Sequence, residues 1–330
     1  MEISFEKIKT ALTGAVYYEV CEKALKPRRF SKAQIEKFIQ FDVGVCKALK
    51  SGASASMKLD FITNSSTFKM KVNCFPASSK PFCFFDFLID GKLYKHLGET
   101  LETPKTFLVE IDIPKGSHRV TVYFPNLLGT DILRAEIDDG AEFTPVEKKA
   151  NILFTGDSIT QGYTAEYSSK TYVNILSQHY DANVVNQGIG GARFDQTDLD
   201  ENLNFNPSTI FVAYGTNDWS KGVDIEKNAF DYFTKLKSIY PNCKIFAILP
   251  IWRGDLKVKE QTTKCSFDKM HTILHNAIER VGGITVIDGR KLVPEDTSLY
   301  MSDTLHPIES GFEHYAKNLI KELKGLGYAF

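Results

Sequence analysis

Apolar and polar residues alternate through much of the first half of the chain. The alternating segments lie at residues 57–62, 68–72, 82–89, 93–97, 107–113 and 120–124, and Ser, Pro and Gly residues separate them. Alternation with a period of two is typical of half-buried antiparallel strands, and Asp90-Gly91 is a strong signal for a hairpin turn. Six or so short strands at this spacing predict an all-β sandwich of the jelly-roll type.

The segments that flank this region have weaker patterns. Residues 8–25 are compatible with a helix or with an irregular strand, and residues 31–39 are typical of a short capped helix. Residues 136–150 are rich in Asp, Glu and Lys, which indicates the last edge of the sandwich followed by a linker. Neither these segments nor the predicted sandwich carries a recognisable catalytic cluster.

From residue 150 onward, short apolar runs alternate with longer amphipathic segments. Strands are predicted at residues 152–155, 183–186, 209–214, 244–249 and 284–287, and helices at residues 171–180, 225–240, 267–281 and 309–325. This alternation indicates a parallel sheet with helices on both faces. In the last helix one apolar stripe indicates core packing and not a cofactor site; it consists of Phe312, Tyr315, Ala316, Leu319, Ile320 and Leu323. We therefore predict two domains, at residues 1–149 and 150–330, as the length of 330 residues also favours.

The first strand of the second domain ends in a turn that carries a candidate nucleophile. The stretch from Ile152 to Gly162 reads ILFTGDSITQG, an apolar run followed by small and polar residues. Catalytic groups of open α/β sheets lie at the carboxyl ends of the strands, and Ser158 falls at that end. The alternative is that Asp157 and Ser158 only cap the next helix, because Asp and Ser are preferred N-cap residues.

A serine hydroxyl needs a base that removes its proton and a third group that orients the base. Asp303 and His306 precede the last predicted helix in a segment that ends with Pro307, again at the carboxyl edge of the sheet. The spacing allows the Asp303 carboxylate to bond to Nδ1 of His306 while Nε2 faces outward. The alternative is a surface loop that happens to contain Asp and His.

Acyl transfer also needs neutral hydrogen-bond donors for the oxyanion that develops on the substrate. Residues 186–191 (NQGIGG) and 215–218 (GTND) each follow a predicted strand and contain glycine and asparagine. The alternative is that both are ordinary turns between strand and helix, where Gly and Asn are common. The glycines of the first segment do not have the spacing of the Gly-x-Gly-x-x-Gly phosphate-binding motif.

These four segments resemble, in the same order, the four sequence blocks of the SGNH, or GDSL-type, hydrolase superfamily. The resemblance covers most of the second predicted domain and implies a flavodoxin-like three-layer α/β/α fold, an open site and hydrolysis of esters. It implies that Ser158 is the nucleophile and that Asp303 and His306 complete the catalytic triad. The backbone N–H groups of Ser158 and Gly191 and the side-chain amide of Asn217 are the implied oxyanion hole.

An N-terminal β-sandwich joined to such a domain is similar to the layout of two-domain esterases that remove acetyl groups from plant polysaccharide fragments. Trp219 and Trp252 follow the third and fourth predicted strands, so we expect them near the mouth of the site, where aromatic rings stack on sugars. Arg253 is a candidate donor to sugar hydroxyls, and Gln161 a candidate contact of the leaving group. The alternative for both tryptophans is that they pack loops, because Trp is mostly buried.

Charge and composition narrow the choice of partners. The chain has 40 basic and 41 acidic residues, for a formal net charge of −1, which gives no global field for nucleic acid or for an anionic membrane surface. The sequence predicts no membrane span and no export signal at its start. We therefore expect a cytoplasmic protein whose partner is a small neutral molecule. The sequence predicts no oligomeric state.

Cysteines and histidines give no sign of a metal site. The six cysteines form no C-x-x-C pair and are expected to be reduced thiols; a disulfide between Cys74 and Cys83 is the less favoured interpretation. His271 and His275 stand four apart on a predicted helix without an evident third ligand, so a solvated helix face is favoured over a metal site. We predict no metal and no organic cofactor.

The sequence therefore predicts a serine esterase that deacetylates small acetylated carbohydrates. Two alternatives stay open. A general short-chain esterase or lysophospholipase would use the same residues, although the chain shows no long apolar lid between the four blocks. A carbohydrate-binding protein with a vestigial hydrolase domain is disfavoured, because every catalytic position is filled.

Overall fold

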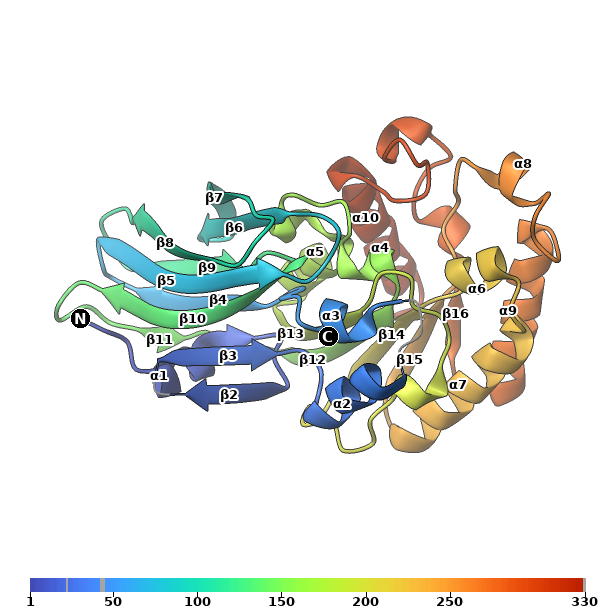
Figure 1. Cartoon of the computed structure of the whole chain (residues 1–330), viewed down its shortest axis with the longest axis horizontal. Coiled ribbons are helices and arrows are strands. Elements are labelled where there is room, and N and C mark those ends of the chain that lie inside the picture. Colours follow the sequence, from blue (N-terminus) through green and yellow to red (C-terminus); the bar gives the residue numbers. More distant parts are fainter. Residues whose placement is uncertain (22, 42–44, 329–330) are drawn as a thin grey trace.

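The computed structural model of the chain describes residues 1–21, 23–41 and 45–328. Two antiparallel sheets form the N-terminal part, and one parallel sheet with helices on both sides forms the C-terminal part (Figure 1). The first antiparallel sheet has the order β1 (Leu12–Thr13), β4 (Lys58–Thr63), β9 (His118–Tyr123), β6 (Phe82–Ile89), β7 (Lys92–Thr100), and β11 (Thr144–Pro145) pairs with β4. The second has the order β2 (Tyr17–Cys21), β3 (Ala24–Arg28), β10 (Leu128–Ile137), β5 (Thr67–Pro76), β8 (Lys105–Asp112).

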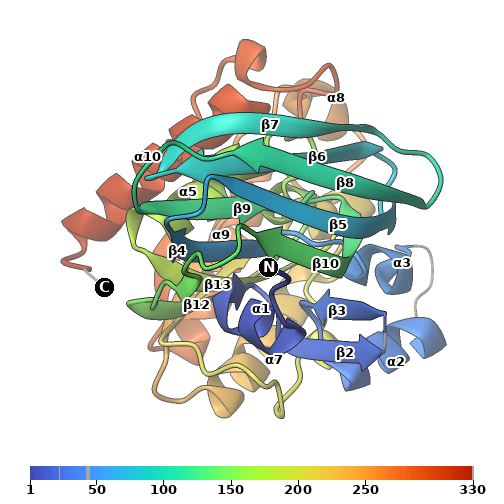
Figure 2. The same ribbon diagram turned by 90° about the vertical axis from the view of Figure 1, so that its left-hand side faces the viewer.

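The two antiparallel sheets enclose one apolar core, to which both contribute inward-facing residues (Figure 2). Phe68 of β5 contacts Phe61 of β4 and Phe87 of β6, with ring centroids 5.2 and 6.5 Å apart. The strand orders are compatible with the expected jelly roll. The predicted hairpin turn is present, since Asp90 and Gly91 both have positive φ angles, of 50° and 78°, as a type I′ turn requires.

The central strand β10 is one element that the sequence pattern did not reveal. The sequence placed only the last edge of the sandwich, from residue 136, in this region, but β10 lies between β3 and β5. Its alternation is broken by a register shift between Ile132 and Arg134. It also carries a buried charge at Asp131, whose carboxylate accepts a hydrogen bond from Arg28 at 3.0 Å. A bulge and an ion pair therefore hide the period of two.

The prediction of half-buried strands is wrong for β4. Lys58 and Asp60 occupy the positions that alternation assigns to solvent, yet both are buried. The reason is that the C-terminal part covers this face: Lys58 donates a hydrogen bond to the hydroxyl of Ser177 at 2.7 Å. Asp60 binds Arg119, which also pairs with Asp181 at 2.7 Å.

The first 51 residues contribute three helices, α1 (Phe5–Ala11), α2 (Lys32–Phe41) and α3 (Lys47–Ser51). The segment left open at residues 8–25 contains the end of α1 and the strands β1 and β2. Val16, Phe30 and Phe38 belong to the apolar core of the parallel-sheet part. The first residues of the chain therefore pack against both parts of the molecule.

The parallel sheet has the order β13 (Ala182–Gly188), β12 (Ala150–Gly156), β14 (Thr209–Ala213), β15 (Lys244–Ile248), β16 (Thr285–Ile287). This is the flavodoxin-like order 2-1-3-4-5, and the predicted three-layer α/β/α fold is confirmed. The long helices are α5 (Tyr172–His179), α7 (Ile225–Ile239), α9 (Phe267–Val281) and α10 (Glu309–Gly325). Short ones are α4 (Ser158–Gln161), α6 (Thr216–Lys221), α8 (Leu256–Lys259), η1 (Ser168–Lys170), η2 (Gln196–Asp198), η3 (Gly289–Lys291) and η4 (Thr297–Leu299).

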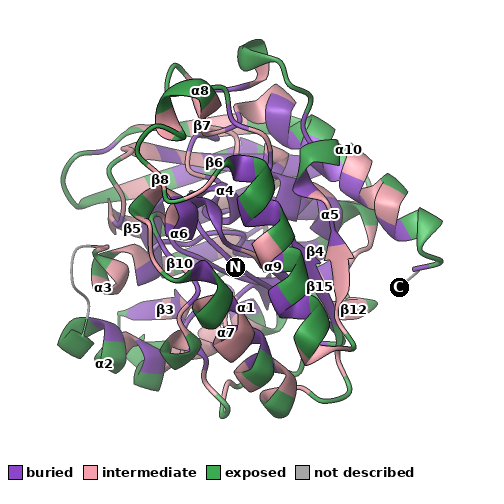
Figure 3. Cartoon of the chain, turned by 90° about the vertical axis from the view of Figure 1, so that its right-hand side faces the viewer, coloured by how far each residue is buried: buried purple, intermediate pink, exposed green. Residues whose placement is uncertain are grey.

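Successive residues of the parallel strands point to opposite faces of the sheet and belong to two separate apolar cores. Leu153 and Val212 pack with α7 and α9 on one face, and Phe154 and Phe211 pack with α5 and α10 on the other. Figure 3 shows the resulting pattern: α7 and α9 carry buried residues on one side and exposed residues on the other. Within the described residues, no helix is both long and apolar enough to cross a membrane.

The structure corrects one expectation about the histidines. His275 is exposed, but His271 is buried on α9 and its ring packs against Phe267 at 4.8 Å. Burial lowers the pKa of His271 to about 4, so the ring is a neutral core residue and not part of a solvated face. Cys74 and Cys83 are both buried and free.

Candidate active site

The candidate nucleophile stands at the tip of β12. Asp157 is the N-cap of α4, and its carboxylate accepts a hydrogen bond from the N–H of Ile159 at 3.0 Å. Ser158, 8% exposed, is the first residue of the helix. A Cβ atom at Gly156 would lie 2.2 Å from the hydroxyl of Thr160, so the turn requires glycine there. Asp157 thus takes the capping role that the sequence allowed for either residue, and the hydroxyl of Ser158 is left for another partner.

The structure brings Ser158, His306 and Asp303 into one hydrogen-bonded chain. Oγ of Ser158 lies 2.8 Å from Nε2 of His306, and Nδ1 of His306 lies 2.6 Å from Oδ2 of Asp303. Oδ1 of Asp303 accepts hydrogen bonds from the backbone N–H groups of Leu305 and His306 at 2.9 and 3.0 Å. The Asp303 carboxylate is therefore fixed by its own loop, with one oxygen left for the imidazole.

The surroundings keep the imidazole neutral. Burial lowers the pKa of His306 below its ordinary 6.5; Asp303 opposes this effect, and the positive charges of Arg253 and Lys80 add to it. The pKa of Asp303 is lowered although burial alone would raise it, because His306 and two backbone N–H groups bind the carboxylate. At neutral pH the pair is a neutral imidazole beside a carboxylate, which is the state a general base needs.

The three donors of the expected oxyanion hole keep N–H groups that the protein itself does not use. The loop after β13 turns at Gly191, whose φ is +85°, and the N–H of Gly190 is occupied by Oε1 of Gln161 at 2.8 Å. Within the described part of the chain, the N–H groups of Ser158 and Gly191 have no hydrogen-bond partner. The amide of Asn217 donates one hydrogen bond, to the carbonyl of Ala192 at 3.0 Å, which leaves its second N–H available.

Residues of the N-terminal part also border this site, and the sequence gave no signal for them. Nζ of Lys50 donates to the carbonyl of Gly190 at 2.7 Å. The ring of Tyr163 lies 4.7 Å from that of His306, and its hydroxyl lies 3.0 Å from the hydroxyl of Ser79. The loop between β5 and β6, which holds Ser79, thus contacts Tyr163, and Tyr163 packs beside His306.

The expected substrate contacts of Gln161 and Trp219 are not supported. Gln161 is 1% exposed and its Oε1 holds the Gly190 turn, so it contacts the oxyanion loop. Trp219 is 3% exposed, donates its Nε1–H to the carbonyl of Cys265 at 2.8 Å and packs edge-on against Phe267. It is a core residue, as the alternative interpretation had it, and its ring offers no face to a sugar.

Arg253 and Trp252 lie near the site with different exposure. Arg253 is buried and pairs with Asp255, with Nη2 at 2.8 Å from Oδ2, and its Nη1 donates to Thr216 at 3.0 Å. It therefore acts on His306 through its charge and is not a free donor to a substrate. Trp252 is half-buried and packs against Tyr300, with ring centroids 5.4 Å apart.

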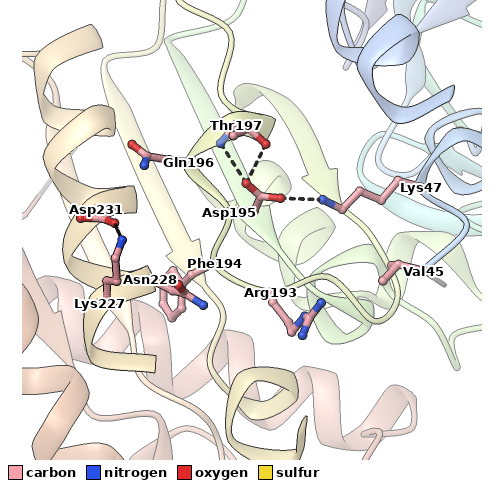
Figure 4. A pocket seen from close by; sticks show the side chains of 10 residues that line it. All are labelled: Val45, Lys47, Arg193, Phe194, Asp195, Gln196, Thr197, Lys227, Asn228 and Asp231. Atoms are coloured by element: carbon pink, nitrogen blue, oxygen red, sulfur yellow. Dashed lines mark hydrogen bonds and ion pairs between the residues drawn. The ribbon is translucent and has the colours of Figure 1, made fainter. Parts of the chain in front are cut away.

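A polar groove adjoins the oxyanion loop. It has a volume of about 320 Å³ and is lined by Val45, Lys47, Arg193, Phe194, Asp195, Gln196, Thr197, Lys227, Asn228 and Asp231 (Figure 4). Val45, which lines the groove, also lies beside Gly191. Its Cγ1 would be 3.5 Å from a Cβ atom added to Gly191, so the groove adjoins the loop after β13. The guanidinium of Arg193 has no hydrogen-bonding or ion-pairing partner among the described residues, whereas Lys47 binds Asp195 at 3.4 Å.

No group of His, Cys, Asp or Glu residues within the described ranges is arranged to hold a metal ion. The buried carboxyls near the site have other roles. Burial raises the pKa of both Asp157 and Asp218 to about 7. Asp157 caps α4, and Asp218 accepts the N–H of Phe194 at 3.3 Å. Both carboxyls therefore hold main chain of the site's loops.

The sequence of this region matches a known family. Residues 154–314 match the model of the GDSL-like lipase/acylhydrolase family. Residues 154–314, just under half of the chain, therefore resemble this family. This match indicates a carboxylic ester hydrolase of the SGNH type. No curated protein sequence matches the chain.

Solved structures share the fold at low sequence identity. The salicylyl-acyltransferase SsfX3 from a tetracycline biosynthetic pathway is 18% identical, with a TM-score of 0.82 over 96% of this chain and 95% of that one. A family two carbohydrate esterase from Clostridium thermocellum, in complex with cellohexaose, is 17% identical, with a TM-score of 0.63 over 83% and 94%. An acetyl xylan esterase from Butyrivibrio proteoclasticus is 15% identical, with a TM-score of 0.58 over 82% and 90%. The likeness covers both the antiparallel and the parallel part.

Proposed function

We propose that the protein hydrolyses acetyl esters of carbohydrates, with Ser158 as nucleophile, His306 as base and Asp303 as the residue that orients the base. The observation that carries this proposal is the continuous chain of hydrogen bonds from Ser158 through His306 to Asp303. A serine paired with a neutral, oriented imidazole is the arrangement that activates a hydroxyl at neutral pH.

In the proposed mechanism, Nε2 of His306 takes the proton from Ser158 as Oγ attacks the acetyl carbonyl carbon. The oxyanion is held by the N–H groups of Ser158 and Gly191 and by the amide of Asn217. His306 then protonates the departing sugar oxygen, and the C–O bond breaks to leave the acetyl group on Ser158. Water, deprotonated by His306, attacks this acyl-enzyme and releases acetate. Asp303 keeps its negative charge throughout and stabilises the imidazolium.

Two observations support a carbohydrate as the alcohol part. Two of the similar solved structures are named as a carbohydrate esterase with bound cellohexaose and as an acetyl xylan esterase. Eight of the ten residues that line the groove beside Gly191 have polar or charged side chains, and Arg193, Gln196 and Asn228 offer donors and acceptors of the kind that bind hydroxyl groups. A groove for a fatty acyl chain would instead be lined by apolar side chains.

A second candidate function is transfer of the acyl group to an alcohol other than water. The similarity to the salicylyl-acyltransferase over almost the whole of both chains favours it. The same acyl-enzyme would form on Ser158, and an acceptor hydroxyl would replace water in the second step. The two functions differ only in what attacks the acyl-enzyme.

The test compares wild type with Ser158→Ala on p-nitrophenyl acetate, butyrate and octanoate and on acetylated xylo- and manno-oligosaccharides. We expect cleavage of acetate esters and of one oligosaccharide class, and none by the variant. Preference for octanoate would favour the lipolytic alternative, and ester formation with an added alcohol would favour the transferase. Activity that survives in Ser158→Ala would contradict the proposed nucleophile.

The same panel tests the groove. Arg193→Gln removes an unpaired donor, so we expect a higher KM for the oligosaccharide and an unchanged kcat/KM for p-nitrophenyl acetate, which is too short to reach it. Arg134→Gln, which alters an exposed arginine on β10, is the control. An equal effect of Arg193→Gln on both substrates would argue against a sugar subsite in the groove.

A further inference from the structure

A buried arginine from the N-terminal part lies directly behind the oxyanion loop. Arg29 follows β3 and has no exposed surface. Its Nη1 donates to the carbonyls of Asn186 and Gly188, both at 2.7 Å. Its Nη2 donates to the carbonyl of Lys50 at 2.7 Å, and its Nε to the carbonyl of Ala53 at 2.9 Å. The guanidinium thus joins the end of β13 to the segment around α3.

All of these acceptors are main-chain carbonyls, which sets Arg29 apart from an ordinary ion pair. Among the described residues no salt bridge joins Arg29 to a carboxylate. Burial lowers the pKa of Arg29 to about 9, so the guanidinium stays charged at neutral pH. An isolated buried charge is destabilising unless its hydrogen bonds are made. The cost of burying this charge is offset only if the carbonyls require the hydrogen bonds that it donates.

The carbonyls need it because β13 is the edge strand of the parallel sheet. Its carbonyls that face away from β12 have no strand to pair with, and buried carbonyls must find a donor. Asn186 and Gly188 are two residues apart, so their carbonyls point to the same side of the strand. The planar fork of one guanidinium reaches both. Arg29 therefore fixes the last residues before the turn that carries Gly190 and Gly191.

Lys50 also binds the turn that carries Gly190 and Gly191. Its Nζ donates to the carbonyl of Gly190 at 2.7 Å, and its own carbonyl is held by Arg29. In a trans peptide the C=O of one residue and the N–H of the next point in opposite directions, and no cis peptide occurs in the described chain. The bond from Lys50 therefore turns the N–H of Gly191 away from Lys50 and fixes its direction.

We infer that Arg29 and Lys50 are positioning residues for the oxyanion-hole N–H of Gly191, so that the N-terminal part completes the catalytic apparatus. The inference rests on the proposed function, in which Gly191 binds the oxyanion. Neither residue touches the reacting atoms in this scheme. Arg29 holds the main chain of β13 and of Lys50, and Lys50 orients the peptide between Gly190 and Gly191. The loss of either is expected to weaken binding of the transition state more than binding of the substrate.

The decisive variant is Lys50→Met, which keeps the length of the side chain and removes the donor. Removal of a whole oxyanion donor lowers kcat by about 100- to 1000-fold. Loss of its orientation should lower kcat on p-nitrophenyl acetate by about 10- to 100-fold, with KM within about twofold of wild type and a closely similar melting temperature. Lys50→Arg, which restores a donor, should recover most of kcat. Lys32→Met, on an exposed lysine of α2, should behave as wild type.

Arg29→Lys is the companion variant, because one ammonium group cannot reach all four carbonyls. It should lower kcat and the melting temperature together. A kcat of Lys50→Met equal to that of wild type, or equal to that of Lys32→Met, overturns the inference while leaving the proposed function intact. Activity that survives in Ser158→Ala overturns the proposed function, and the inference with it. The two failures are therefore distinguishable in one set of assays.

Discussion

The two sides of the site differ in where their residues come from in the chain. On the triad side, Ser158, Asp303 and His306 all belong to the C-terminal part and contact one another directly. On the oxyanion side, the donors also belong to that part, but Arg29 and Lys50 of the N-terminal part hold the loop that carries one of them. In the proposed mechanism the reacting groups therefore come from one part of the chain, whereas their positioning depends on both parts.

This difference indicates how an N-terminal β-sandwich can position a loop at the site of an α/β domain. The last residues of an edge strand have unpaired carbonyls, and a second domain that docks there supplies the donors. In our proposal, the same contacts stabilise the fold and position the loop that carries Gly191. The predictions below test each side of this comparison separately.

The largest effect is expected on the triad side. His306→Ala removes the base, so kcat on p-nitrophenyl acetate should fall by about 1000-fold or more, with the fold unchanged. His314→Ala, which alters an exposed histidine of α10, should keep full activity. Steady-state kinetics and circular dichroism check this prediction, and a decrease below tenfold would remove His306 from the mechanism.

The contact between the two parts should give the next largest effect. The buried carboxylate of Asp60 accepts hydrogen bonds from Arg119 at 2.9 and 2.7 Å and pairs with Lys148. Asp60→Ala leaves these cations short of a partner and should lower the free energy of unfolding by about 3 kcal/mol. Urea denaturation measures it, with Asp112→Ala, an exposed carboxylate of β8, as the control. Equal stability of the two variants would show that the network does not hold the parts together.

Lys58 gives the same contact a dependence on pH. Burial, aided by the charge of Lys148, lowers the pKa of Lys58 from 10.5 to about 7 in the folded protein. Between these two values the unfolded chain binds more protons, so the free energy of unfolding should rise with pH above 7. The slope from Lys58 should approach about 1 kcal/mol per pH unit between about pH 7.5 and 9. Lys58→Met should lose it, and Lys71→Met, on the exposed side of β5, should keep it; equal slopes would contradict the assignment.

The smallest effect concerns the charge of Lys80, through which the N-terminal part acts on His306. Lys80 of the N-terminal part helps to lower the pKa of His306, and catalysis needs the neutral imidazole. The kcat/KM should therefore fall as the pH drops below the lowered pKa, which lies under 6.5. Lys80→Gln should move this acidic limb to higher pH by a few tenths of a unit, while Lys95→Gln, an exposed lysine of β7, should not. A shift to lower pH would have the wrong sign for this explanation.

The sequence predicted the parts of this molecule whose signals are short and consecutive. The parallel sheet and the four long helices follow from apolar periods, whereas the flavodoxin-like fold was implied by the resemblance of the four sequence blocks. Each of these blocks spans only a few neighbouring residues. Ser158 and His306 are 148 positions apart, but each stands in a recognisable turn at the carboxyl edge of the sheet. Because catalytic groups lie at the carboxyl ends of the strands of such a sheet, the sequence was enough to predict that Ser158 and His306 meet.

The parts that the sequence did not predict depend on contacts between distant segments. Arg29 and Lys50 have no distinctive neighbours in the sequence, and their contacts with the loop after β13 become visible only in the folded structure. Trp219 has the residue type and position of a sugar platform, but packing against Phe267 buries it. β10 was missed because a bulge and the Asp131–Arg28 pair interrupt its alternation. In each case contacts between distant segments, and not the local sequence pattern, determine the burial and the partners of these residues.

The most direct test of the central claim is to find the acyl group. Wild-type protein mixed with p-nitrophenyl acetate, quenched with acid during turnover and digested, should carry one acetyl group, on the peptide that contains Ser158. His306→Ala should show far less of this adduct, since the base is needed to form it. An acetyl group on another residue, or turnover with no adduct at any quench time, would contradict Ser158 as the nucleophile.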